Sequence, residues 1–160
     1  MATPTSLPSS FTAGDVLTAA NMNNLRGAFR ILQLSVAVMD TQQTSTTTTY
    51  TDITGASVTI TPQATTNKIL IVSSNAFLAS VNKADAGLRF LRDATNIYTE
   101  IAAVLATDTG GNFTSIHLDS PNSTSAIIYK AQFARTSGTG TLYHSLAGTA
   151  GAFLVAEISA

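Results

Sequence analysis

The stretch NKILIVSSNAFLASV, residues 67–81, decides the fold class of this sequence of 160 residues. Its first half places Ile69, Leu70, Ile71 and Val72 in a row, so both faces of an extended strand would be apolar. Strands with two apolar faces lie in the middle of a sheet or between the layers of a fold. We therefore predict a central β-strand here and expect the domain core to form around it.

The segments around this strand are also typical of β-structure. In Ser57–Thr61, Val58 and Ile60 alternate with polar residues until Pro62 ends the strand. Gly, Asn, Asp and Pro mark turns at residues 93–96, 107–112, 119–122 and 137–140. The predicted strands are residues 31–39, 57–61, 67–81, 87–92, 97–105, 113–118, 125–135, 141–146 and 152–158, and the Thr run at 45–50 is a strand or a strand-flanking loop. Strands at this spacing, without helical patterns between them, predict an all-β fold: an antiparallel β-sandwich of the jelly-roll type, or a barrel.

The first 30 residues have a different character. Residues 1–10 hold two prolines among Thr and Ser and predict an extended arm. A short helix is predicted over Ala19–Phe29, because Met22, Leu25 and Phe29 fall on one helical stripe. Asparagines and a glycine weaken this helix, so it needs a surface to dock on, either its own domain or a partner. We divide the chain into an attachment segment, residues 1–30, and a β-sandwich domain, residues 31–160.

The composition excludes several classes of protein. Only 11% of the residues are charged and the net charge is −1, which gives no electrostatic footprint for nucleic acid or for an anionic membrane. The chain has no cysteine, no membrane-length apolar run and no export signal at its start. Thr, Ser and Ala make up about two fifths of the sequence. A surface so poor in charge is best explained if other subunits cover much of it.

The sequence offers little for catalysis or for metal binding. His117 and Asp119 share one face of a predicted strand, but no further histidine or cysteine pattern completes a metal site. There is no G-x-S-x-G elbow, and Gly138–Gly140 is a hairpin turn without a following helix. Lys83, Arg89 and Arg92 form the densest basic group. The chain has no tryptophan, so it offers few aromatic rings on which a sugar could stack. We expect no enzymatic activity and no cofactor.

Several stretches resemble one family. Residues 11–25, FTAGDVLTAANMNNL, are similar to an N-terminal motif of tailed-bacteriophage virion proteins, especially tail fibres and other appendages. The remainder resembles a small family of phage structural proteins, through residues 58–62, 67–71, 90–97, 119–133 and 157–158. Together these matches span most of the chain.

The resemblance implies a non-enzymatic, homotrimeric β-sandwich on the virion. It favours a tail appendage, a fibre or tail-tip module; a capsid decoration protein or head fibre is the alternative, and a receptor- or sugar-binding module is less favoured. The expected partners are other copies of the chain and other virion proteins, with the host cell surface left open. The expected attachment residues are Phe11, Val16, Leu17, Met22, Leu25 and Phe29.

Overall fold

The structure is a computed structural model that describes residues 31–80, 82–106, 108–145 and 149–159. Within these ranges all regular elements are β-strands, and no helix has the length and apolarity to cross a membrane. The predicted helix at Ala19–Phe29 lies outside the described residues. The strands are β1 (Ile31–Met39), β2 (Gln43–Ser45), β3 (Thr51–Ile60), β4 (Lys68–Ala79), β5 (Ala84–Arg92), β6 (Thr95–Leu105), β7 (Gly110–Asp119), β8 (Ile127–Gly138), β9 (Leu142–His144) and β10 (Gly151–Ile158).

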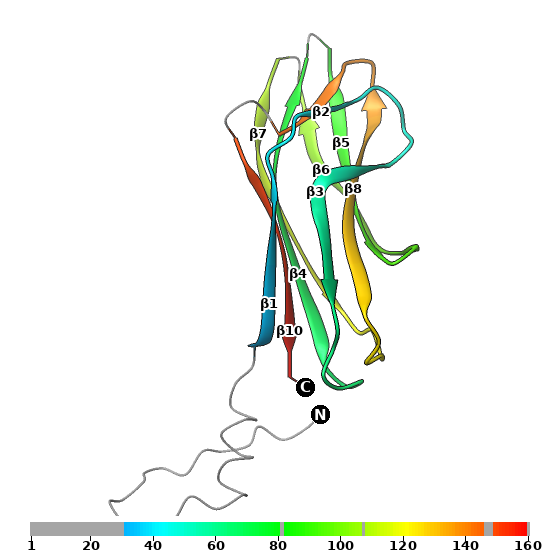
Figure 1. The fold of residues 1–160 in the computed structure, drawn as a ribbon. Coiled ribbons are helices and arrows are strands. Elements are labelled where there is room, and N and C mark those ends of the chain that lie inside the picture. Colours follow the sequence, from blue (N-terminus) through cyan, green and yellow to red (C-terminus); the bar gives the residue numbers. More distant parts are fainter. Residues whose placement is uncertain (1–30, 81, 107, 146–148, 160) are drawn as a thin grey trace, which may run out of the picture.

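The strands form two antiparallel sheets that pack face to face (Figure 1). In the first sheet β1 pairs with β10, β10 with β4, and β4 with β7; the short strands β9 and β2 continue the sheet beside the end of β4. The second sheet has the order β3-β8-β5-β6. The predicted antiparallel β-sandwich is confirmed.

The order of the eight long strands explains why the domain has two layers. Numbered along the chain without β2 and β9, they run 1-8-3-6 in one sheet and 2-7-4-5 in the other. Successive long strands therefore mostly change sheet, and the last strand returns to lie beside the first. This is the interleaved Greek-key order of a jelly roll.

The core lies between the sheets and is rich in aromatic side chains. Phe77 on β4 approaches Phe133 on β8, with 6.4 Å between ring centroids, and Phe90 on β5 lies 5.9 Å from Phe153 on β10. On β4 the inward side chains Ile69, Ile71 and Phe77 are fully buried, whereas the outward ones are half-buried. The prediction that β4 is a central strand is confirmed, since it pairs along both edges.

One prediction left open is decided, and another needs correction. Of the Thr run at residues 45–50, expected as a strand or a strand-flanking loop, only Ser45 belongs to a strand, and the rest is loop. The Gly110–Gly111 pair, predicted as a turn, instead begins β7 opposite Leu78 and Phe77. A Cβ at residue 110 would lie 2.7 Å from the Phe77 carbonyl oxygen, so the glycine serves the close approach of two strands.

Candidate interaction surface

The outward side of the first sheet carries complete rows of apolar side chains. Strand register places Val36 beside Leu154, Leu154 beside Val72, and Val72 beside Ile116. The neighbouring row, in the same strand order, is Leu34, Ala156, Leu70 and Leu118. We call the eight residues of these two rows, together with Val38, the outer apolar face.

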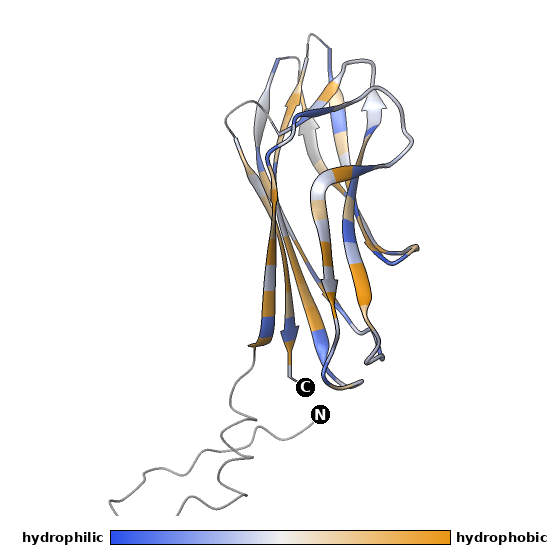
Figure 2. Cartoon of the chain, viewed as in Figure 1, coloured by the Kyte–Doolittle hydropathy of each residue, from blue (hydrophilic) through white to orange (hydrophobic). Residues whose placement is uncertain are grey.

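The edges of this face, on β1 and β7, are open to solvent in a single chain, whereas Leu70, Val72 and Leu154 in its middle are half-buried and Ala156 is buried. Leu34, Val36, Val38 and Leu118 are each more than half exposed, and Ile116 is 61% exposed. Figure 2 shows hydrophobic colour in bands along β1, β10 and β4. Soluble monomers rarely leave such a contiguous apolar patch uncovered. The face therefore has the character of a contact surface.

In the part of the chain that the structure describes, few charged groups border the outer apolar face. On one side the row that begins with Val38 continues with Ala152, Ser74 and Thr114, none of which is charged. On the other side Lys68 ends the sheet, and its ammonium group donates a hydrogen bond to Ser120 Oγ at 2.7 Å. A partner for this surface must consequently be recognised by shape and apolar contact, because there is little charge to complement.

The outward side of the second sheet has the opposite chemistry. Lys130 lies 3.3 Å from Asp52, and Asp52 also accepts a hydrogen bond from Gln132. The Gln132 hydrogen bond is the main cause that lowers the pKa of Asp52. Arg89 donates to Gln132 Oε1 at 2.6 Å and lies over the Tyr50 ring at 4.5 Å. These solvated polar pairs are typical of a surface that faces water.

Between the sheets, a buried carboxylate joins the two layers. Asp119 on β7 accepts hydrogen bonds from Arg92 on β5, at 3.1 Å, and from the Tyr129 hydroxyl on β8, at 2.7 Å. Burial, and then the hydrogen bond to Asp119, raise the pKa of Tyr129. The group ties β5 and β8 of one sheet to β7 of the other, so its role is structural.

A second buried carboxylate lies at the end of the molecule where β1 begins. Glu157 is fully buried and accepts hydrogen bonds from Gln33 Nε2 (2.5 Å), the Gln63 backbone N–H (2.7 Å) and Asn67 Nδ2 (2.5 Å). Burial acts to raise the pKa of Glu157, but these hydrogen bonds outweigh burial and lower it. The carboxylate thereby fixes β1 and the 61–67 loop against β10.

The two histidines lie apart. The His117 ring packs 5.0 Å from the Tyr98 ring, and the neighbouring Asp119 is occupied by Arg92 and Tyr129. His144 is buried elsewhere in the core. The described residues contain no group of three or more His, Asp or Glu placed to hold a metal ion.

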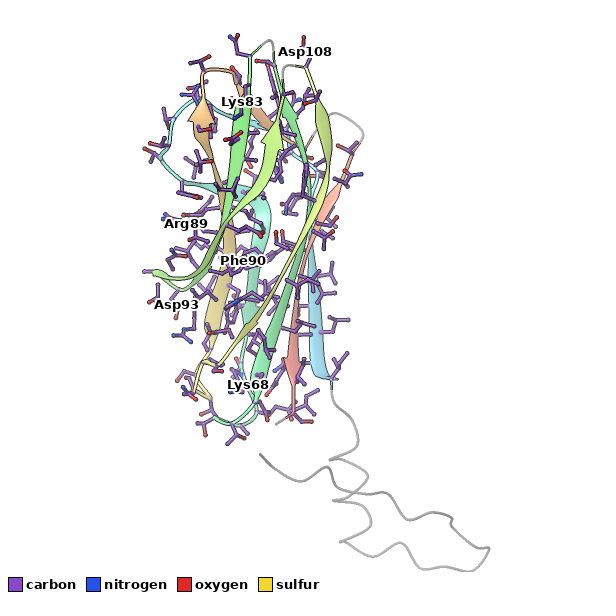
Figure 3. All side chains as sticks on the ribbon, turned by 180° about the vertical axis from the view of Figure 1, so that it is seen from behind. Lys68, Lys83, Arg89, Phe90, Asp93 and Asp108 are labelled. Atoms are coloured by element: carbon purple, nitrogen blue, oxygen red, sulfur yellow. The ribbon has the colours of Figure 1, made fainter. Side chains whose placement is uncertain are left out.

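The basic residues that cluster in the sequence do not form one patch. Lys83 lies 3.6 Å from Asp85, whereas Arg89 and Arg92 bind different groups on opposite sides of their sheet. Figure 3 shows Lys83 near one end of the sandwich and Arg89 in its middle. Among the described residues the large exposed apolar side chains are aliphatic, so they do not form an aromatic platform for a sugar.

The predicted attachment residues, Phe11, Val16, Leu17, Met22, Leu25 and Phe29, all lie outside the described residues. The outer apolar face was not singled out from the sequence. The sequence did hold a partial signal for this face: in residues 31–39 and 69–72 both sides of the strand carry apolar side chains. What the sequence pattern lacks is the register that places β1 and β7 on one sheet with β10 and β4 between them.

No protein-family model and no curated protein matches this sequence. Among solved structures, the chain is similar to infectious bursal disease virus, Gt strain, with 14% identity over 82% of this chain and 38% of that chain and a TM-score of 0.49. It is also similar to the VP2 subviral particle of that virus (14% identity, 80% and 38% covered, TM-score 0.47) and to Bacillus endospore appendages that form disulfide-linked pili (13%, 79% and 89%, TM-score 0.38). The chain thus spans well under half of the length of the viral chains. At these identities and TM-scores the similarity carries no information beyond the strand order already described.

Proposed function

We propose that this chain is a structural protein of a tailed-bacteriophage particle. In this proposal the β-sandwich, residues 31–160, forms a homotrimeric tail appendage, a fibre or tail-tip module, and residues 1–30 attach it to the particle. The observation that carries the proposal is the outer apolar face, a surface that an isolated subunit would leave in water. The jelly-roll strand order supports it by analogy, because virus capsid proteins use that architecture.

The chemistry of the polar groups supports a non-enzymatic role. The buried carboxylates of Asp119 and Glu157 are both held by groups that connect strands and loops. A catalytic group needs access to a substrate, whereas these side chains serve the fold. The resemblance of residues 11–25 to tail proteins favours the tail over a capsid decoration or head fibre.

The attachment role of residues 1–30 can be tested in the full chain. Met22→Asp together with Leu25→Asp should leave folding and oligomerisation intact but abolish incorporation into particles, because charges replace the apolar stripe of the predicted helix. Incorporation is measured by immunoblotting particles purified after the variant replaces the natural chain. A chain that starts at Ile31 should behave in the same way.

The matched control is Asn23→Asp with Asn24→Asp, which adds the same charge off the stripe and should be incorporated normally. Normal incorporation of the Met22/Leu25 variant would show that the stripe is not the anchor. If the chain that starts at Ile31 failed to fold, the segment would belong to the core of the domain instead.

A further inference from the structure

We propose that the outer apolar face is the surface through which copies of this chain pack against one another. The inference deepens the proposed function by naming the partner of this surface, and it rests on that function only for its biological setting. It is carried by the rows of side chains on β1, β10, β4 and β7 and by their exposure.

The size of the face fits a protein interface. Four strands about 4.8 Å apart, taken over the roughly four residues of about 3.4 Å each that the two rows span, give a flat area of about 260 Å², and the flanking row on each side raises this to about 500 Å². Side-chain relief makes the accessible area larger than this projection. A specific interface buries about 800 Å² on each partner, so the face and its margins supply an area of that order.

The predicted N-terminal helix is too small to cover the face. Eleven residues, Ala19–Phe29, form a helix about 16 Å long and about 10 Å wide, which covers about 160 Å². Its stripe of three apolar side chains would leave about two fifths of the two rows, and their margins, in water. A second copy of the chain brings a surface of the same size, flatness and chemistry.

The geometry also says which strands meet. Three copies around a threefold axis parallel to the strands turn their faces toward the axis, so neighbouring sheets meet at about 60° along their edges. The middle of the face lies between β10 and β4, with β1 along one edge and β7 along the other. Around a threefold axis parallel to the strands, β1 of one copy therefore meets β7 of the next copy. Val36 of one copy then lies near Ile116 of its neighbour.

The first test is the mass of the full chain in solution. Light scattering at micromolar concentration should give about 50 kDa, three times the 16.6 kDa of one chain. Val36→Asp with Ile116→Asp should reduce the mass threefold while circular dichroism stays unchanged, because both side chains lie outside the core. The control, Thr59→Asp, adds charge at an exposed site on the second sheet and should stay trimeric.

The second test is a disulfide cross-link. The natural chain has no cysteine, so every disulfide must come from the introduced residues. Within one chain, positions 36 and 116 are separated by three strand spacings, about 14 Å, too far for a disulfide. Val36→Cys with Ile116→Cys should therefore form disulfides only between copies, with two- and three-chain bands after mild oxidation. Either single variant should give no three-chain band.

A monomeric natural chain, an Asp variant that stays oligomeric, or a Cys variant that gives only single chains would each overturn the inference. A dimer that the Asp variant dissociates would support the surface and contradict the proposed trimer. None of these readouts involves phage particles. Self-association through this face without incorporation into particles would refute the proposed function alone. Incorporation as a monomer would refute this inference and the proposed trimer, but would leave the structural role in the particle standing.

Discussion

His144 is a titratable side chain that lies fully buried in the core. Its ring packs against Phe77 and Phe133, with ring centroids 5.4 Å away in both cases. Nε2 lies 3.2 Å from Asn75 Oδ1, and Nδ1 has no hydrogen-bond partner among the described residues. Burial lowers the pKa of His144 from 6.5 to about 4. The imidazole is therefore neutral in the folded protein at physiological pH.

This shift predicts a loss of stability in mild acid. Below pH 6.5 the unfolded chain binds a proton at this position, whereas the folded chain does not until about pH 4, so folding becomes less favourable as pH falls through this window. The full effect is about 3 kcal/mol by pH 4. Urea midpoints at a fixed protein concentration should fall between pH 7 and pH 5, a range that lies above the ordinary pKa of Glu157, 4.5.

His144→Gln removes the titrating group and should flatten this dependence, although it lowers stability at every pH. His117→Gln, at the half-buried other histidine of the chain, is the matched substitution: equal flattening in both variants would show that the effect does not belong to His144. An unchanged slope in His144→Gln would show that the acid sensitivity comes from another group.

At the scale of elements, β4 is a central strand of the first sheet, because it pairs with β10 along one edge and with β7 along the other. Ile71 lies on its inward face, fully buried, between Val155 on β10 and His117 on β7. Ile71→Asp places an unpaired carboxylate in the core and should cost about 3 to 5 kcal/mol. We expect a large fall in the thermal midpoint or insoluble protein. Ser57→Asp, an exposed change on β3, should leave the midpoint nearly unchanged; equal effects of the two changes would show that Ile71 is not a core residue.

Element prediction succeeded where hydrophobic period alone decides the structure. The bounds of β1 match those expected from the sequence, and β4 differs from its prediction by one or two residues at each end. For the Thr run the sequence left a strand and a strand-flanking loop open, because threonine favours strands but also bonds locally. Ser45 Oγ donates to the Thr47 carbonyl, and Thr47 Oγ accepts from the Thr49 N–H, so the backbone turns away from the sheet.

At the scale of the whole molecule, the sequence indicated assembly but not the surface that we propose for it. Low charge pointed to covered surfaces, and the structure locates a large apolar one on a single side of the sandwich. Val36 and Ile116 lie far apart in the chain and meet on one face only through the register of β10 and β4. Side-chain alternation within a strand is a local pattern and can be predicted. Pairing between strands that are distant in the chain cannot be predicted from any short segment alone.

The pairing of β1 with β10 has a consequence for how the protein is made. A ribosome adds roughly 5 to 20 residues per second, so β10 emerges about 6 to 25 seconds after β1. Until then β1 has no strand beside it and its apolar side chains stay in water, although the β5–β6 hairpin can already form. Nascent chains arrested before residue 151 should therefore be cleaved by protease within β1, and chains arrested once β10 has left the ribosome should resist. The first strand therefore waits unpaired for most of synthesis, and this is the interval in which its apolar side chains can aggregate.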